Sequence, residues 1–257
     1  IRQGLTKRHG IEYREGELAN PEAIKAVHDP DYVDEVEAFC ADGGGTWDAD
    51  TVAVEKTWEA ALASAGLACW AADEAIDGAD GRQTPFSIGR PPGHHAEFDE
   101  AMGFCFFNNA AVAAQHAIDR DGSGVDRAVI FDWDVHHGNG TQDIFYDRDD
   151  VLVVSLHADH DSWSRDTHPQ ACDLTEQGAG DGTGHTVNVP LPPGTGDEGY
   201  RYAMDELVAP VIAAYDPDAV LVSAGQDPGT MDPLGRNTVT KPGFESLGAE
   251  ARRLASA

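Results

Sequence analysis

The sequence predicts an α/β protein whose mainly parallel sheet is covered by helices on both faces. Three segments share one layout, a continuous apolar run that ends in polar side chains: Ala128–Phe131, Val151–Leu156 and Ala219–Val222. Continuous apolar strands separated by helices are typical of parallel sheets buried on both sides. No internal repeat, low-complexity tract or linker divides the 257 residues, so we expect one domain over residues 1–257.

The other elements are predicted in chain order. Pro21–His28 and Pro30–Ala41 are expected to be short helices, because each has a proline near its first turn. Val52–Asp77 has the spacing of one long Ala-rich helix. Further along the chain we expect a strand at Thr84–Ile88, a helix at Asn108–Asp119, a strand at His185–Val189 and a helix at Phe244–Ala257.

The charge balance is strongly acidic, with 46 acidic residues against 17 basic ones and a formal net charge of -29. Such a surface repels nucleic acid and anionic membranes, because both require basic patches on the protein. The acidity either attracts cationic substrates or reflects adaptation to a salt-rich cytoplasm, where screening removes the self-repulsion. Acidic residues are spread over the whole chain, which favours the halophilic interpretation.

Cysteine usage and hydropathy favour a reduced, cytoplasmic protein. None of the four cysteines forms a C-x-x-C pair, and an even number alone does not indicate disulfides in a chain of this length. No stretch approaches the roughly 20 apolar residues of a transmembrane helix. The oligomeric state is left open, a homo-oligomer included.

The segment Asp132–Gly140 has the composition of a metal site. In a strand, alternate side chains share a face, so Asp132, Asp134 and His136 are expected on one side. Two carboxylates and an imidazole at a strand end are unfavourable unless a cation offsets them, and these donors suit zinc. Asp227 closes another apolar strand at the same edge, where ligands of parallel sheets bind. Three protein ligands leave a fourth position for water, which is the catalytic pattern.

Two adjacent histidines, His94 and His95, follow a Pro-Pro-Gly turn. A neutral imidazole accepts a proton near pH 7, and a neighbouring carboxylate can hold its tautomer. Taken alone the pair is compatible with two surface histidines. Beside the carboxylate-rich segment it favours general acid–base catalysis.

Several motifs in the same order and spacing resemble the histone-deacetylase family, most closely class II members and their bacterial and archaeal relatives. The resemblance covers at least Asp50 to Gly248. It implies the arginase–deacetylase fold. The motifs are Arg90–His95, Gly103–Asn108, Asp132–Gln142, Val154–His157, Val187–Leu191 and Ser223–Asp227.

The resemblance implies that Asp134, His136 and Asp227 bind Zn²⁺. It also implies that His94 and His95 are the tandem catalytic histidines, one acting as general base and then acid while the other supports it electrostatically. Zinc then polarises the amide carbonyl and activates water. The reaction is removal of acetyl groups from acetyl-lysine or similar acetylated amines.

Further residues take supporting roles by the same resemblance. Asp132 would hydrogen-bond His94, and Asn139 would pair with His95, where class I relatives carry Asp. The residues implied to contact substrate are Gly103 and Phe104, as a wall of the acyl-lysine tunnel, and Asp50, which would hold the substrate backbone. Relatives often bind K⁺ near the metal, and the residues implied here are Asp132, Asp134, the carbonyl of His136, Ser155 and Leu156.

The sequence departs from the family in its oxyanion donor and its tunnel. Family members usually carry a Tyr in a late Gly-Gly-Tyr motif, and no Tyr follows Asp227 here. We therefore expect a chain cut at both ends, without the C-terminal part of the family domain and slow in turnover, since losing one oxyanion donor costs about 10²–10³ in rate. The usual aromatic pair is also lacking in the loop 157–180, where Trp163 or His168 would substitute.

Three alternatives stay beside the deacetylase hypothesis. A small-molecule amidohydrolase acting on acetylpolyamines is one, although Leu234 stands where polyamine-preferring relatives carry an acidic gate residue. A non-catalytic acyl-lysine binding module is another. A manganese ureohydrolase would need more Asp ligands bridging two metals than this sequence provides.

Overall fold

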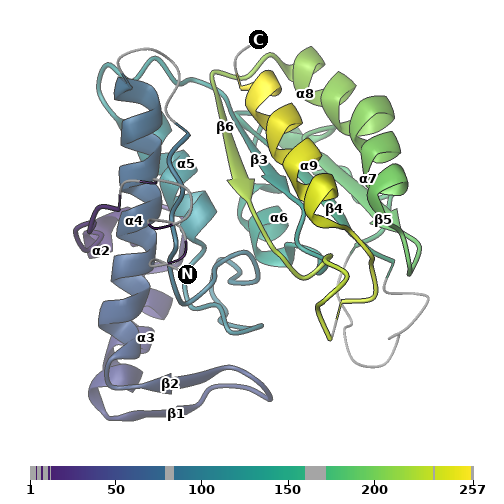
Figure 1. The fold of residues 1–257 in the computed structure, drawn as a ribbon. Coiled ribbons are helices and arrows are strands. Elements are labelled where there is room, and N and C mark those ends of the chain that lie inside the picture. Colours follow the sequence, from purple (N-terminus) through teal and green to yellow (C-terminus); the bar gives the residue numbers. More distant parts are fainter. Residues whose placement is uncertain are drawn as a thin grey trace.

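The computed structural model describes residues 4, 7, 11, 13–78, 84–159, 172–233 and 235–255. At its centre lies a four-stranded parallel sheet in the order β5-β4-β3-β6 (Figure 1). The predicted parallel sheet is confirmed, and its three apolar runs are adjacent strands. The strands are β3 (Ala128–Asp132), β4 (Val151–Ala158), β5 (Thr186–Leu191) and β6 (Ala219–Ser223).

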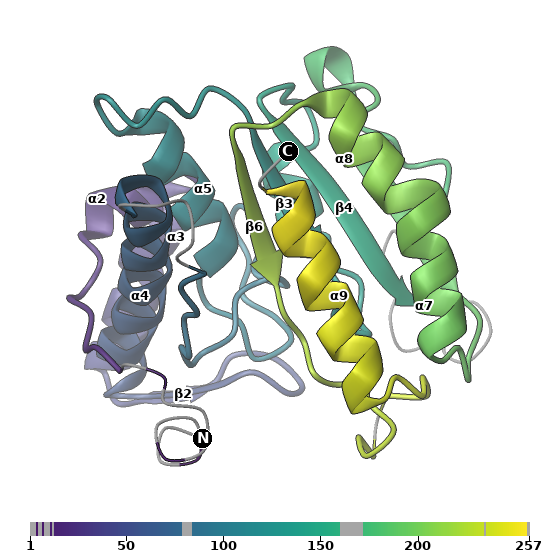
Figure 2. The ribbon, with the colours of Figure 1, turned by 45° about the horizontal axis from the view of Figure 1, so that its top comes forward.

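Helices cover both faces of this sheet (Figures 1 and 2). Because side chains alternate along a strand, Ala128 and Ile130 of β3 join one hydrophobic cluster while Val129 and Phe131 join the other. The first cluster contains residues of α2 (Pro21–Lys25), α3 (Pro30–Ala41), α4 (Thr57–Asp77), α5 (Asn109–Asp119) and α6 (Asn139–Phe145). The second contains residues of α7 (Asp197–Ala203), the π-helix η3 (Met204–Val208), α8 (Ala209–Tyr215) and α9 (Lys241–Leu254).

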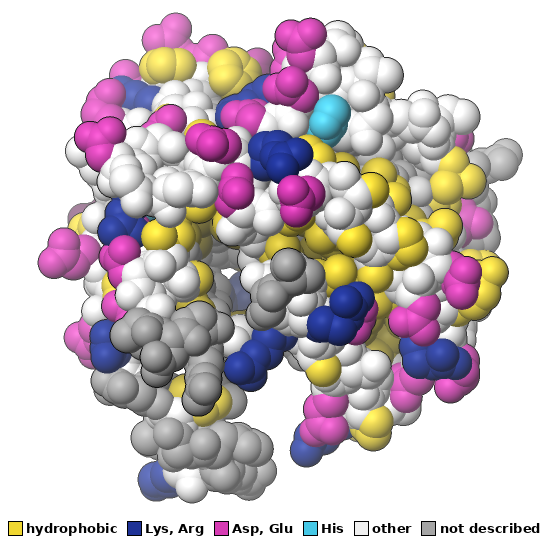
Figure 3. Space-filling model, turned by 90° about the horizontal axis from the view of Figure 1, so that it is seen from above, with side chains coloured by type: hydrophobic (Ala, Val, Ile, Leu, Met, Phe, Trp, Pro, Cys, Tyr) yellow, Lys and Arg dark blue, Asp and Glu magenta, His cyan; other side chains and the backbone are white. Residues whose placement is uncertain are grey.

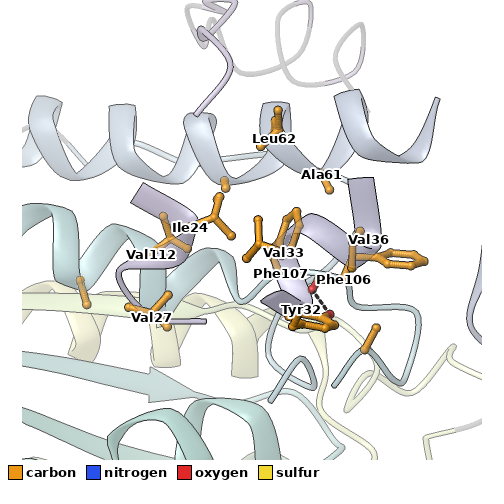
Figure 4. Packing of buried hydrophobic residues seen from close by; sticks show 14 of the residues in the cluster. Ile24, Val27, Tyr32, Val33, Val36, Ala61, Leu62, Phe106, Phe107 and Val112 are labelled. Carbon is orange, nitrogen blue, oxygen red and sulfur yellow. Dashed lines mark hydrogen bonds between the residues drawn. The ribbon is translucent and has the colours of Figure 1, made fainter. Parts of the chain in front are cut away.

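The first cluster packs the N-terminal helices around an aromatic centre (Figure 4). The hydroxyl of Tyr32 donates to the carbonyl of Phe106 at 2.6 Å, so this buried phenol has its polar group satisfied. The ring of Phe107 meets those of Tyr32 and Trp58 edge to face. These contacts tie α3 and α4 to the segment that leads into α5.

The predicted long helix at Val52–Asp77 begins later than expected, at Thr57. Residues Val52–Val54 instead form β2, which pairs antiparallel with β1 (Gly44–Thr46). The hydroxyl of Thr57 accepts from the backbone N–H of Val54 at 2.9 Å, at the turn between strand and helix. Pairing with the preceding strand in a local hairpin therefore overrides the helical spacing.

The strand predicted at Thr84–Ile88 is wrong. Within the described residues this segment pairs with no strand, and Phe86 and Ile88 stay exposed instead of entering the sheet. Pro85 also lacks the N–H that a ladder requires. The segment runs close to α4, since a Cβ at Gly89 would lie 2.1 Å from the hydroxyl oxygen of Ser64.

The helix predicted at Pro30–Ala41 is confirmed with both ends, and the remaining predicted elements are present with shifted ends. The helix predicted to end at His28 ends at Lys25, and the last helix begins at Lys241. β5 runs through Pro190, which is tolerated because β5 is an edge strand. Helices α7 and α8, the π-helix between them and the short η2 (Gly180–Gly182) were not anticipated.

Acidic side chains are scattered among basic ones over the face at the amino ends of the strands, without gathering into one patch (Figure 3). Among the described residues, no helix is both long and apolar enough to cross a membrane.

Candidate metal and catalytic site

The candidate site lies at the carboxyl edge of the sheet, where loops follow β3 and β6. The loop after β3 carries Asp134 and His136, and the loop after β6 carries Asp227. The tandem histidines His94 and His95 arrive from a loop before α5. The sequence expectation that these five side chains belong together is consistent with their geometry.

The three predicted metal ligands converge. One potential ligand atom from each of Asp134, His136 and Asp227 lies within 4.8 Å of the others. The Nδ1 of His136 is 3.0 Å from Asp134 Oδ1 and 2.9 Å from Asp227 Oδ2. Two facing carboxylates need a positive charge between them. Two oxygens and one imidazole nitrogen form a donor set that fits a divalent cation such as zinc.

The Asp-x-Asp-x-His spacing works differently from the prediction. β3 ends at Asp132, so Asp134 and His136 lie in a loop and do not share a strand face with it. Instead, Asp132 Oδ1 accepts from the N–H of Asp134, and Asp134 Oδ1 accepts from the N–H of His136, both at 2.9 Å. Each carboxylate thus caps the backbone two residues further on. Two successive turns of this kind aim the ligands.

Contacts between loops hold the ligands in register. Asp227 Oδ1 accepts from the N–H of Val135 at 2.9 Å, while the indole N–H of Trp133 donates to the carbonyl of Gly225 at 3.1 Å. A Cβ at Gly225 would lie 2.3 Å from Asp134 Oδ2 and 2.5 Å from its Cα. Only glycine therefore fits at this position beside the ligand.

His94 is bound to a carboxylate. Its Nδ1–H donates to Asp132 Oδ2 at 2.8 Å, and its Nε2 lies 3.9 Å from Asp134 Oδ2. Asp132 is 1% exposed. The N–H of Thr141, in the first turn of α6, donates to the carbonyl of His94 at 3.2 Å and fixes the backbone.

His95 has a neutral partner instead. Its Nδ1–H donates to the amide oxygen of Asn139 at 2.7 Å, and Asn139 is buried as the first residue of α6. The ring of His95 lies 4.0 Å from that of His94 and 5.9 Å from that of His136, centre to centre. A free Nε2 is left as the proton acceptor of His95 in this tautomer.

The two histidines have opposite electrostatic surroundings. Burial opposes charge on His94, but the carboxylates of Asp132 and Asp134 outweigh it and raise its pKa to about 9. Burial and the neighbouring charge of His94 hold the pKa of His95 well below its ordinary value. Groups whose surroundings separate their pKa values in this way are suited to different roles in one reaction.

Burial also opposes charge on His136, but its hydrogen bonds to Asp134 and Asp227 raise its pKa to about 10. Burial and the nearby carboxylate of Asp134 raise the pKa of Asp227. Positive charge is therefore favoured at this position, where a bound cation would take the place of the imidazole proton.

The predicted substrate residues lie beside the histidines. Gly103 has φ +55°, and a Cβ there would lie 2.4 Å from the His95 ring. Phe104 also has a positive φ of 66° and leaves 54% of its surface exposed. The N–H of Phe104 donates to Thr51 Oγ1 at 3.1 Å, which brings the hairpin loop carrying Asp50 to the same rim.

Of the residues predicted for K⁺, Asp132, Ser155 and Leu156 lie on neighbouring strands, whereas Asp134 and His136 lie in the loop after β3. Asp132 is paired with Ser155 across the β3–β4 ladder, and Leu156 follows in β4. Ser155 Oγ contacts His157 Nδ1 at 2.9 Å. Among the other predicted positions, Leu234, Trp163 and His168 lie outside the described residues.

Sequence reasoning missed two residues that hold the histidine loop. Glu97 accepts from the amide of Asn139, and His28 accepts the N–H of Asn108 while donating to the backbone of Glu97. Neither residue belongs to a recognisable spacing. An acid two residues after a histidine pair was the only signal that could have drawn attention to Glu97.

A family model described as "Histone deacetylase domain" matches residues 1–257. The chain is 40% identical over 249 residues to a "Histone deacetylase-like amidohydrolase" of Pseudomonas aeruginosa, which covers 97% of this chain and 63% of that protein. The chain spans about half to two thirds of the length of such curated relatives.

Two solved structures are similar over nearly the whole chain. The crystal structure of "HDA15 HD domain" has a TM-score of 0.86 at 36% identity, covering 95% of this chain and 67% of that one. An acetylpolyamine aminohydrolase from Burkholderia pseudomallei has a TM-score of 0.84 at 30% identity, covering 99% of this chain and 86% of that one. These likenesses confirm the predicted fold.

Proposed function

This chain belongs to the histone deacetylase family, and from that premise we propose that it is the catalytic part of a zinc-dependent hydrolase that removes acetyl groups from acetylated amines, with acetyl-lysine as the first candidate. The observation that carries the proposal is the convergence of three metal-type ligands beside two histidines with different partners.

Asp134, His136 and Asp227 would hold the zinc ion. When bound, zinc supplies Lewis acidity, which activates water and polarises the amide carbonyl. Three ligands from the protein leave room for water and substrate. We further propose K⁺ as a structural ion, held near Asp132 and Ser155 behind the site.

His95 serves as the general base. Its proton sits on Nδ1, donated to Asn139, so Nε2 takes a proton from the attacking water and later delivers it to the leaving amine. His94 remains protonated beside Asp132, and its positive charge stabilises the negative charge that develops on the carbonyl oxygen. The two histidines take different roles because His94 is bound to the carboxylate of Asp132 and His95 to the amide of Asn139.

An acetylpolyamine is the second candidate substrate. The likeness to an acetylpolyamine aminohydrolase and the formal net charge of -29 both favour a cationic small molecule. Gly103 and Phe104 would line the acyl tunnel for either substrate, and Asp50 would hold a peptide backbone. A peptide-specific enzyme should therefore depend on Asp50, whereas a polyamine-specific one should not.

The test measures zinc content and hydrolysis of an acetyl-lysine peptide and of acetylspermidine, in molar KCl. Asp134→Ala should lose both zinc and hydrolysis, while Asp121→Ala, at an exposed turn after α5, should lose neither. Zinc binding without hydrolysis of either substrate would favour a non-catalytic acyl-lysine binding module. A protein that binds no zinc would refute the proposal.

A further inference from the structure

The NH₂ group of Asn139 lies near three hydrogen-bond acceptors. Its Nδ2 lies 2.6 Å from Glu97 Oε1, 3.2 Å from the sulfur of Met102 and 3.4 Å from the carbonyl oxygen of His95. Its Oδ1 accepts from His95 Nδ1 at 2.7 Å. The donor end of the amide therefore faces acceptors, and the acceptor end faces the histidine.

The orientation of this amide decides where the proton of His95 sits. An asparagine amide has nearly the same shape when it is rotated by half a turn, but its donor and acceptor exchange places. In the rotated form, the NH₂ group of Asn139 would face His95 Nδ1, which would then have to accept. The ring proton would move to Nε2, and His95 would no longer present a lone pair to the reaction.

Glu97 provides the strongest reason for the observed orientation. An ionised carboxylate can only accept, and a hydrogen bond to it is stronger than one to a carbonyl or a thioether. Its bond to Asn139 is also the shortest of the three. A rotated amide would direct its oxygen at the carboxylate, which is repulsive.

The backbone of Glu97 is held rigidly enough to place that carboxylate. Its N–H donates to the carbonyl of Glu100 at 2.9 Å, and its own carbonyl accepts from His28 Nδ1 at 2.8 Å. The neighbouring N–H of Phe98 donates to Asp143 in α6 at 2.9 Å. The loop is thus fixed to the helix that begins with Asn139.

We propose that Glu97 is a positioning residue for the deacetylase reaction, whose carboxylate fixes the amide of Asn139 and thereby keeps the proton of His95 on Nδ1. The inference deepens the proposed function and rests on it, but the tautomer is a property of the resting protein. The carboxylate of Glu97 contacts the amide of Asn139. It acts two hydrogen bonds away from the reacting nitrogen.

Histidine tautomers are distinguished by ¹⁵N chemical shifts in protein labelled at its histidines, recorded with zinc bound and with the His95 signals assigned from His95→Gln. The native protein should show His95 protonated at Nδ1. Glu97→Ala should move a substantial fraction of the signal to the Nε2–H form. Glu100→Ala, an exposed acid in the same loop, should leave the tautomer unchanged.

Kinetics provides the second readout. Glu97→Ala should lower kcat by about 10–100-fold while KM changes less than about twofold, as expected of a residue that orients a catalytic group. Asn139→Asp alone places two carboxylates against each other and should be impaired further. Adding Glu97→Gln to it supplies an amide donor to the introduced carboxylate, so the double variant should recover activity over Asn139→Asp.

A purely structural role for Glu97 predicts a different pattern. It would lower stability without changing the tautomer, and the double variant would be worse than either single one. Either result would overturn the proposal. If the native protein hydrolyses neither substrate while the tautomer responds to Glu97→Ala, the proposed function fails but the positioning role stands.

Discussion

Acidification to pH 5 should destabilise this protein through His28, which is buried in its neutral form with no exposed surface. Its Nδ1–H donates to the carbonyl of Glu97, and its Nε2 accepts from the N–H of Asn108 at 2.9 Å. A proton added to Nε2 would point at the N–H of Asn108, so the hydrogen bond would be lost and two donors would face each other. Burial lowers the pKa of His28 to about 4, against 6.5 in an unfolded chain.

The sign and size of the effect follow from proton linkage. Between pH 4 and 6.5 the unfolded chain binds more protons at His28 than the folded protein does. The stabilisation is therefore fully present above pH 6.5 and is lost as pH falls towards 4. At pH 5 the protonation factors of the two states differ about 30-fold, which corresponds to about 2 kcal/mol of unfolding free energy; at pH 7.5 the difference is close to zero.

The assay is urea unfolding at pH 7.5 and pH 5.0, in molar KCl with a chelator present so that metal binding does not contribute. The comparison variant is His28→Gln, whose amide oxygen can still accept from Asn108 but does not titrate. The native protein should lose about 2 kcal/mol more than the variant between the two pH values. His116→Gln, which removes a half-buried histidine near Asp73, controls for the loss of any histidine. Equal losses in the native protein and His28→Gln would refute the reasoning.

Three further perturbations test the site and the surface. Gly225→Ala should abolish zinc binding because the added methyl group overlaps Asp134. The control variant Gly248→Ala, which has open space around the added methyl group, should bind zinc normally. Metal analysis after gel filtration measures the zinc content of both variants. Asp132→Asn should lower the pKa of His94 from about 9, because it removes the larger of the two carboxylate contributions that outweigh burial. The same substitution should reduce kcat by about 10²–10⁴-fold. NMR titration measures the change in pKa, and steady-state kinetics measures the change in kcat. The acidic surface should make the melting temperature rise between dilute buffer and molar salt, and an unchanged value would contradict the halophilic interpretation.

The centre of the fold could be predicted because its strands carry a local signal. Val151–Leu156 and its two neighbours are apolar runs, which are typical of the strands of a sheet buried on both faces. The Val52–Val54 strand carried no such signal. Its conformation depends on Gly44–Thr46, and a pairing of this kind cannot be inferred from helical spacing.

The candidate site was predictable in its members but not in its construction. Asp134 and His136 were expected on a strand face because their spacing is two, yet the same spacing also produces successive backbone caps in a loop. Glu97 was overlooked because its role depends on the side of Asn139 that it faces. Such a relation exists only in three dimensions.

The bond between Val135 and Asp227 spans 92 residues of chain, and this separation has a consequence for folding kinetics. Contacts between distant segments form slowly, because loop-closure entropy must be lost before they contribute any stabilisation. Since β6 reaches β3 only after the chain has passed through β4, β5 and the helical segments α6, η2, α7, η3 and α8, the ligand triad can assemble only when the sheet is ordered. In a refolding experiment, zinc capture should therefore trail the recovery of helical circular dichroism. The time course of zinc binding would therefore measure the formation of the native sheet and not the early collapse of the chain.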